Sequence, residues 1–127
     1  MSRYIKDALY QLAIETKQVA LETKQGVSVV NAEDIVCVEA AQRKVLVHCL
    51  SGGIQTTLSI DRLRDLLDLP CFFSTYRSFI VNMKYVREIK KDLVVLSYEG
   101  KTKEAYLAKR RYTDFKMAYL MYLEGMQ

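Results

Sequence analysis

The feature that most constrains this sequence is a succession of short β-branched runs, each ended within a few residues by a turn or a break. Residues 34–39 read DIVCVE and residues 44–50 read KVLVHCL, with Ala41-Gln42-Arg43 interrupting the pattern between them. β-branched residues favour strands, and runs of this composition are expected to be buried. Ser51-Gly52-Gly53 and Glu99-Gly100 have the residue types of tight turns. Strands at hairpin spacing predict an antiparallel sheet.

The remaining pattern adds further strands and three helices. Strands are also predicted at 19–22, 27–30, 54–58, 71–74, 85–89, 93–98 and 102–107. Apolar residues at helical spacing predict helices at 4–16, 60–67 and 112–123, the last with a stripe of aromatic residues that we expect to pack on the sheet. The predicted fold is therefore mainly β and antiparallel, with a short helix between strands and a helix at each end.

Composition fits one ordinary globular domain. The chain has 127 residues, of which 50% are hydrophobic and 27% charged. The N-terminal stretch mixes Arg3 and Asp7 with its apolar residues, unlike a signal peptide, and no apolar run approaches the roughly 20 residues of a membrane helix. We therefore expect a cytoplasmic protein without membrane contact, whose three cysteines, Cys37, Cys49 and Cys71, are reduced and packed.

Catalytic and metal-binding chemistry find little support. His48 is the only histidine, and within the strand at 44–50 it is expected to be structural. Cys49 would face the opposite side of that strand, which disfavours a Cys-His pair. No nucleophile-elbow, phosphate-loop or dinucleotide-binding motif occurs, and the cysteines do not have zinc spacing. The sequence predicts no enzyme, no metal and no cofactor.

Basic residues gather in the breaks between strands. The net charge is +4, and residues 77–111 hold ten Lys or Arg against four Asp or Glu. Arg43-Lys44, Arg77 and Lys109-Arg110-Arg111 lie in three separate connections, which a β scaffold can bring to one edge. Guanidinium groups suit phosphate oxygens and the edge of guanine. A nucleic acid or an acidic protein is therefore the expected partner.

Three segments of the sequence match the pattern of a known domain family in the same order. They are DIVCVEAAQRKVLVH at 34–48, FFSTYRSFIVNMKYVREI at 72–89 and YLAKRRY at 106–112. Together they resemble the LytTR-type DNA-binding domains, the output modules of many bacterial response regulators. In that family a strand enters a loop with a His-Arg-Ser-like triplet, here Tyr76-Arg77-Ser78, followed by a short helical turn ending in Val-Asn, here Val81-Asn82. The match of all three segments makes the resemblance specific.

The resemblance implies an elongated, mostly antiparallel fold whose loops enter successive major grooves of duplex DNA and bend it, without a recognition helix. It implies a DNA-binding domain at 18–127, including the C-terminal helix, behind a linker or helix at 1–17. Residues carried over from the family are Arg43, Arg77 and Arg110 for base contacts, Lys44, Tyr76, Ser78, Lys109 and Arg111 for phosphate contacts, and Asn82 for loop geometry.

The resemblance also implies partners and a context. Two copies are expected to bind imperfect direct repeats, and a receiver domain is expected in the intact regulator. Because the first residues resemble the end of a linker, we expect an output domain excised from a longer chain, with a free-standing regulator as the alternative. Tyr76 replaces the family's usual histidine and Ala108-Lys109 its usual Val-Ser, so the preferred DNA sequence cannot be carried over.

We therefore expect sequence-specific binding of double-stranded DNA for transcriptional control in a two-component system. The alternative is a basic protein-interaction module, an adaptor or inhibitor, that lacks sequence-specific DNA binding. RNA binding through a β platform is disfavoured, because the segment KTKEAYLA offers only Tyr106 for base stacking.

Overall fold

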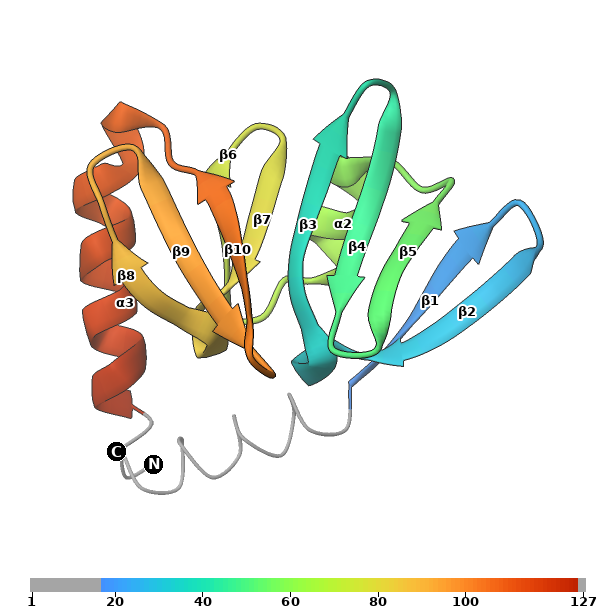
Figure 1. Ribbon diagram of the computed structural model, residues 1–127, viewed down its shortest axis with the longest axis horizontal. Helices are drawn as coiled ribbons and strands as arrows, with labels where there is room; N and C mark the ends of the chain where they lie inside the picture. The colour runs from blue at the N-terminus through green and yellow to red at the C-terminus, as the bar shows by residue number, and fades with distance from the viewer. Residues whose placement is uncertain (1–16, 126–127) are drawn as a thin grey trace.

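The computed structural model describes residues 17–125 and forms ten strands there (Figure 1). The strands are β1 (Gln18–Thr23), β2 (Gly26–Asn31), β3 (Ile35–Ala41), β4 (Lys44–Cys49), β5 (Gly52–Thr56), β6 (Phe72–Tyr76), β7 (Phe79–Asn82), β8 (Val86–Ile89), β9 (Leu93–Tyr98) and β10 (Lys101–Tyr106). The helices are α2 (Ile60–Leu66) and α3 (Tyr112–Gly125), with 3-10 turns η1 (Ala32–Asp34), η2 (Met83–Tyr85) and η3 (Lys109–Arg111). The helix predicted at 4–16 lies outside the described residues.

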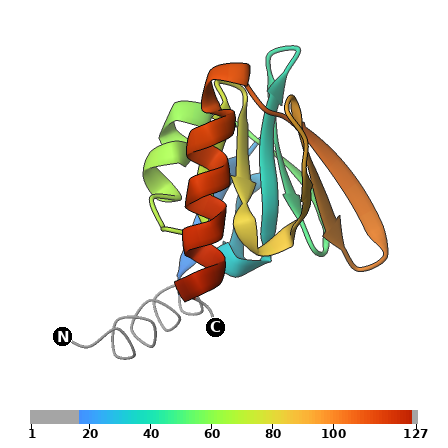
Figure 2. The same cartoon turned by 90° about the vertical axis from the view of Figure 1, so that its left-hand side faces the viewer.

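All strand pairs are antiparallel and form three sheets. Their orders are β1-β2, β10-β9-β8 and β5-β4-β3-β7-β6. Helix α2 lies behind the five-stranded sheet, and α3 lies at the end of the molecule beside the three-stranded sheet (Figures 1 and 2). The prediction of a mainly β antiparallel fold, with one helix between strands and one at the C-terminus, is confirmed. No helix in the described chain has the length and apolarity needed to cross a lipid bilayer.

One local prediction is wrong. Residues 79–82, expected as a helical turn from the family resemblance, form strand β7, which pairs with β3 on one side and β6 on the other. The sequence Phe79-Ile80-Val81 is aromatic and β-branched, and such residues favour a strand with partners on both edges. The helical turn comes directly after it, at η2, where the Asn82 side chain accepts a hydrogen bond from Lys84 N at 3.0 Å.

The core forms two clusters that share the central strands β3 and β7. One cluster lies between the five-stranded sheet, α2 and β1, and includes Val38, Leu63 and Ile80. The other lies between the central strands, the three-stranded sheet and α3, and includes Val81 and Phe115. Because successive strand residues point to opposite faces, Ile80 and Val81 serve one cluster each. The two central strands therefore hold the two halves of the molecule together.

Helix α3 packs through one face only. Phe115 is fully buried, and the Tyr119 hydroxyl donates to Val86 O at 3.3 Å. The opposite face exposes apolar side chains, among them Met117, Leu120 and Met121. The aromatic stripe therefore packs within the domain, as the sequence predicts, and fixes the segment η3 that leads into the helix.

A polar bridge joins β10 to the central sheet. Glu39 Oε1 on β3 accepts a hydrogen bond from Lys103 Nζ on β10 at 3.0 Å and lies 3.1 Å from His48 Nε2 on β4. Burial alone would raise the pKa of Glu39, but the hydrogen bonds from Lys103 and His48 lower that pKa below the ordinary 4.5. The only histidine of the chain is thus part of a structural bridge.

This bridge predicts a pH dependence of stability. Because the pKa of Glu39 is lower in the folded state than in the unfolded state, its stabilising effect is present above about pH 4.5 and is lost as the pH falls through the folded pKa. Urea unfolding should therefore show a steeper loss of stability on acidification for the wild type than for Glu39→Gln. The exposed Glu104 on β10 is the control, and Glu104→Gln should follow the wild type. A stability difference between Glu39→Gln and wild type that stays constant with pH would contradict the assignment.

Candidate nucleic-acid interface

The three arginine-bearing connections lie along one edge of the molecule. They are the β3–β4 turn, the β6–β7 turn and η3, and all three are at the upper edge of Figure 1. Ala40 N at the end of β3 donates to Ser78 O at 2.9 Å, which places the β6–β7 turn beside the β3–β4 hairpin. Ala108 N donates to Thr75 O at 2.9 Å, which places the start of η3 beside β6. Connections that are far apart in the sequence are thereby brought to a common edge.

The arginines at this edge face solvent. Arg43, Arg77 and Arg110 are all exposed. Among residues 17–125, no ion pair joins any of the three guanidinium groups to a carboxylate. Positive charge that no acidic side chain neutralises is available to an anionic partner.

A fourth basic turn, which the sequence analysis did not select, extends this edge. Leu107 N donates to Asp92 O at 3.1 Å, so the turn between β8 and β9, with the exposed Lys90 and Lys91, lies beside the end of β10 and η3. Its signal in the sequence is the same as for the other connections, namely basic residues in the break between two strands. We call the resulting set the basic edge: Arg43, Lys44, Arg77, Lys90, Lys91, Lys109 and Arg110.

The β3–β4 turn holds Arg43 in an unfavourable backbone conformation. Gln42 and Arg43 both have positive φ, 53° and 64°, and together they form the two-residue turn between Ala41 and Lys44. Two successive positive φ angles define a type I′ turn, in which Asn-Gly is preferred. A side chain other than glycine in this region costs about 1–2 kcal/mol. Turn stability therefore does not explain an arginine here.

The positive φ of Arg43 predicts that substitutions at this position change the stability of the fold and the affinity for DNA independently. Arg43→Gly should be more stable than Arg43→Ala by about 1 kcal/mol, because glycine removes the steric cost of positive φ and alanine keeps it. Both variants lose the guanidinium and should bind DNA equally weakly. Urea unfolding and fluorescence anisotropy measure the two quantities. Equal stability of the two variants would show that the turn is not strained.

The Arg77 guanidinium packs against one ring of an aromatic pair. Its guanidinium carbon lies 5.5 Å from the centre of the Tyr76 ring, and that ring meets Tyr106 edge to face with centroids 4.6 Å apart. A cation–π contact at an exposed site contributes about 0.5–1 kcal/mol. Tyr106, which is 47% exposed, is a member of this edge that the sequence does not predict. Tyr76, a predicted phosphate contact, is half-buried and supports the side chain of Arg77.

Three other predicted site residues have distinct positions. Ser78 closes the β6–β7 turn and is half-buried. Arg111 is also half-buried, and its Nη1 donates to Ser74 O at 3.0 Å, so only its other N–H groups remain for phosphate. Asn82 is buried at the other end of β7, where its Nδ2 donates to Ile35 O at 2.9 Å. The geometry that Asn82 holds is the corner between β7 and η2.

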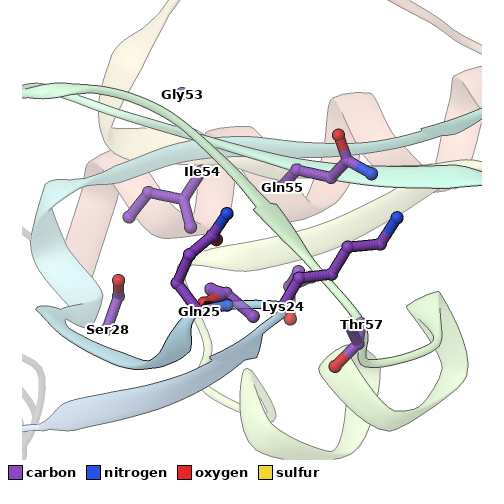
Figure 3. Close-up of a pocket in the computed structure, with 9 residues that line it drawn as sticks. Lys24, Gln25, Ser28, Gly53, Ile54, Gln55 and Thr57 are labelled. Carbon is purple, nitrogen blue, oxygen red and sulfur yellow. Dashed lines mark hydrogen bonds between the residues drawn. The ribbon is translucent and has the colours of Figure 1, made fainter.

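A polar groove lies at the β5 edge of the five-stranded sheet. It has a volume of about 440 Å³ and lies between the β1–β2 turn and β5 (Figure 3). Its described lining residues include Lys24, Gln25, Gln55 and Thr57, and none of them is a carboxylate, histidine or cysteine. Within residues 17–125, no cluster of three or more His, Cys, Asp or Glu side chains forms a metal site. The features that point to a ligand are those of the basic edge.

Comparison with known proteins gives three findings. Residues 25–119 match the family model described as the LytTr DNA-binding domain. The transcriptional regulatory protein NatR of Bacillus subtilis (strain 168) is 24% identical over 105 residues, which cover 80% of this chain and 45% of NatR, so the chain spans about half the length of that relative. A solved structure of the LytTr DNA-binding domain of a response regulator from Bacillus cereus has 22% identity and a TM-score of 0.64, and the match covers 83% of this chain and 97% of that one. The last likeness shows the fold.

Proposed function

The chain belongs to the LytTR family of DNA-binding domains, and from this premise we propose that it reads specific duplex sequences through the basic edge, to regulate transcription. The observation that carries the proposal is the placement of Arg43, Arg77 and Arg110. They come from three separate connections, face solvent along one edge, and are not neutralised by carboxylates of the described chain.

The shape of the edge suits a major groove. Two of the three connections are two-residue turns of antiparallel hairpins, Gln42-Arg43 and Arg77-Ser78. The major groove of B-DNA, roughly 12 Å wide, admits a two-stranded ribbon, and arginine there pairs with O6 and N7 of guanine. In the proposed complex these two turns and Arg110 approach base edges, and the four lysines of the basic edge contact phosphates.

The chain's wider context is part of the proposal. NatR is a transcriptional regulatory protein about twice the length of the matched segment. By analogy we propose that this chain works as the output domain of a response regulator, with residues 1–17 as the connection to a receiver domain. We further propose that two copies bind imperfect direct repeats.

Selection from a randomised duplex pool, followed by anisotropy titrations, tests the proposal. The selected duplex should bind at least about 10³-fold more tightly than random duplex. On random duplex, log Kd should increase with log salt by a slope between about 4, if only the four lysines of the basic edge neutralise phosphates, and about 6, if its three arginines do so as well, because each neutralised phosphate adds about 0.9. If the selection enriches no sequence and heparin displaces the probe as well as random duplex does, sequence reading is refuted and the basic protein-interaction module is favoured.

A further inference from the structure

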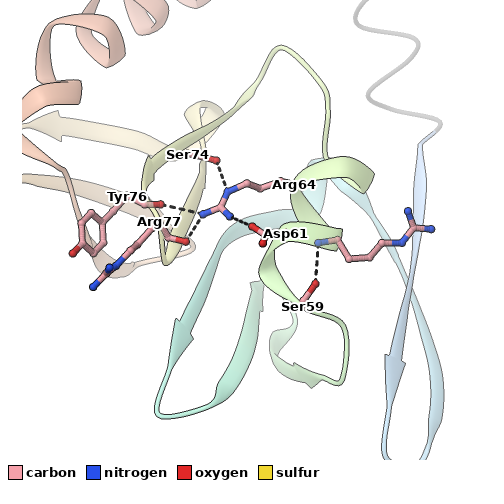
Figure 4. Close-up of polar contacts among 7 residues, drawn as sticks. Ser59, Asp61, Arg64, Ser74, Tyr76 and Arg77 are labelled. Atoms are coloured by element: carbon pink, nitrogen blue, oxygen red, sulfur yellow. Dashed lines mark hydrogen bonds and ion pairs between the residues drawn. The ribbon is translucent and has the colours of Figure 1, made fainter.

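One arginine close to the basic edge is not part of it. Arg64 lies on α2, and its side chain extends to the β6–β7 hairpin (Figure 4). Nε donates to Ser74 Oγ at 3.1 Å, Nη2 donates to Tyr76 O at 3.4 Å and to Arg77 O, and Nη1 donates to the Asp61 carboxylate. With 27% of the side chain exposed and every nitrogen engaged within the protein, Arg64 is not placed to bind DNA.

The β6–β7 turn needs support from outside the hairpin. Two-residue hairpin turns favour types I′ and II′, which require a positive φ at the first turn residue. Within the described chain, the non-glycine residues with positive φ are Gln42, Arg43 and Glu99, so Arg77-Ser78 is of neither type. The pairing of β6 with β7 is also irregular between Phe73 and Tyr76. The hairpin by itself therefore does not favour the conformation in which it presents Arg77.

Arg64 supplies that support at Arg77. It donates to the carbonyl oxygens of the two peptide groups that flank the Cα atom of Arg77, Tyr76 O before it and Arg77 O after it. The planar guanidinium presents its donors in a fixed geometry, and Asp61 holds it from the other side. Figure 4 shows the Arg77 side chain leaving the turn away from Arg64. Fixing these carbonyls fixes the point and direction from which Arg77 reaches outward.

We propose that Arg64 is a positioning residue for sequence readout: it holds the β6–β7 turn so that Arg77 meets its base pair, and it makes no contact with DNA. The inference rests on the proposed function. A lysine cannot replace this fork, because it offers a single charged centre in place of the planar set of donors.

The test compares Arg64→Ala and Arg64→Lys with Arg77→Ala. Each variant is titrated against the selected duplex, against random duplex, and against duplexes with single substituted base pairs. Arg64→Ala and Arg64→Lys should both lose about tenfold on the selected duplex, less than twofold on random duplex, and preference only at the base pairs that Arg77→Ala also affects. Thermal unfolding verifies that each variant is folded. Asp61→Asn weakens the partner of Arg64 without removing the guanidinium, and it should lower the affinity for the selected duplex by a smaller factor.

Two further comparisons make the result specific. Arg62, on the same helix, lines a different groove near β1, and Arg62→Ala should leave both affinities unchanged. In the Arg77→Ala background, Arg64→Ala should have almost no additional effect, since the two residues act as one unit. Three outcomes would each overturn the inference. Arg64→Ala could lose affinity equally on both duplexes, or it could lose a full tenfold in the Arg77→Ala background. Arg64→Lys could also keep the specificity of the wild type.

The failures of the two proposals are distinguishable. If Arg77→Ala weakens selected and random duplex equally, the proposed reading of bases by Arg77 fails and this inference fails with it. If Arg77→Ala shows a selective loss and Arg64→Ala does not, only the positioning role is refuted.

Discussion

Replacing Arg77 or Arg110 by alanine should weaken binding to the selected duplex by about 10- to 100-fold each, because a bidentate arginine–guanine contact contributes roughly 1–3 kcal/mol of discrimination. Both side chains are exposed at the basic edge, and the described chain supplies no carboxylate to hold them elsewhere. On random duplex the same variants should lose only the share that one positive charge contributes to phosphate attraction.

Anisotropy titrations on both duplexes measure this difference. Lys101→Ala is the matched control, because Lys101 is exposed and lies at the opposite end of β10 from η3. It removes the same charge from the molecule and should change both affinities little. If Arg77→Ala or Arg110→Ala loses equally on the two duplexes, that arginine contacts phosphate and not a base.

Much of the fold can be predicted from the sequence because the strands are short, β-branched and separated by turns. The hairpins around Glu99-Gly100 and between β1 and β2 appear where the pattern places them. Strand β7 is not predicted, because the family resemblance suggests a helical turn at the same residues. Residues 79–82 form a strand because they pair with β3, whose residues are far away in the sequence, and a local sequence pattern does not predict such a partner.

The candidate site is also only partly predictable from the sequence. The basic residues could be selected from the sequence because they interrupt apolar runs, and the structure brings their connections to one edge. Their supports could not be selected. Arg64 acts on backbone carbonyl oxygens, which every residue has, and Tyr106 meets Tyr76 only because β10 crosses beside β6. Contacts of this kind depend on tertiary packing and leave no pattern in the sequence.

The position of Arg110 depends on the helix into which its segment leads. η3 continues directly into α3, and the first turn of that helix carries Phe115, which is fully buried. Its ring lies 5.0 Å from the ring of Phe73 on β6, the strand that ends at the Arg77 turn. One aromatic contact therefore couples the two elements that carry Arg77 and Arg110.

Phe115→Ala should consequently lower the free energy of unfolding by about 3–5 kcal/mol, since it removes a fully buried ring and leaves a cavity against Phe73. Leu120→Ala, on the exposed face of the same helix, should cost no more than about 0.5 kcal/mol. Urea unfolding of both variants measures the difference. Similar losses for the two would mean that α3 is not anchored through Phe115 and that η3, with Arg110, is held in place by other contacts.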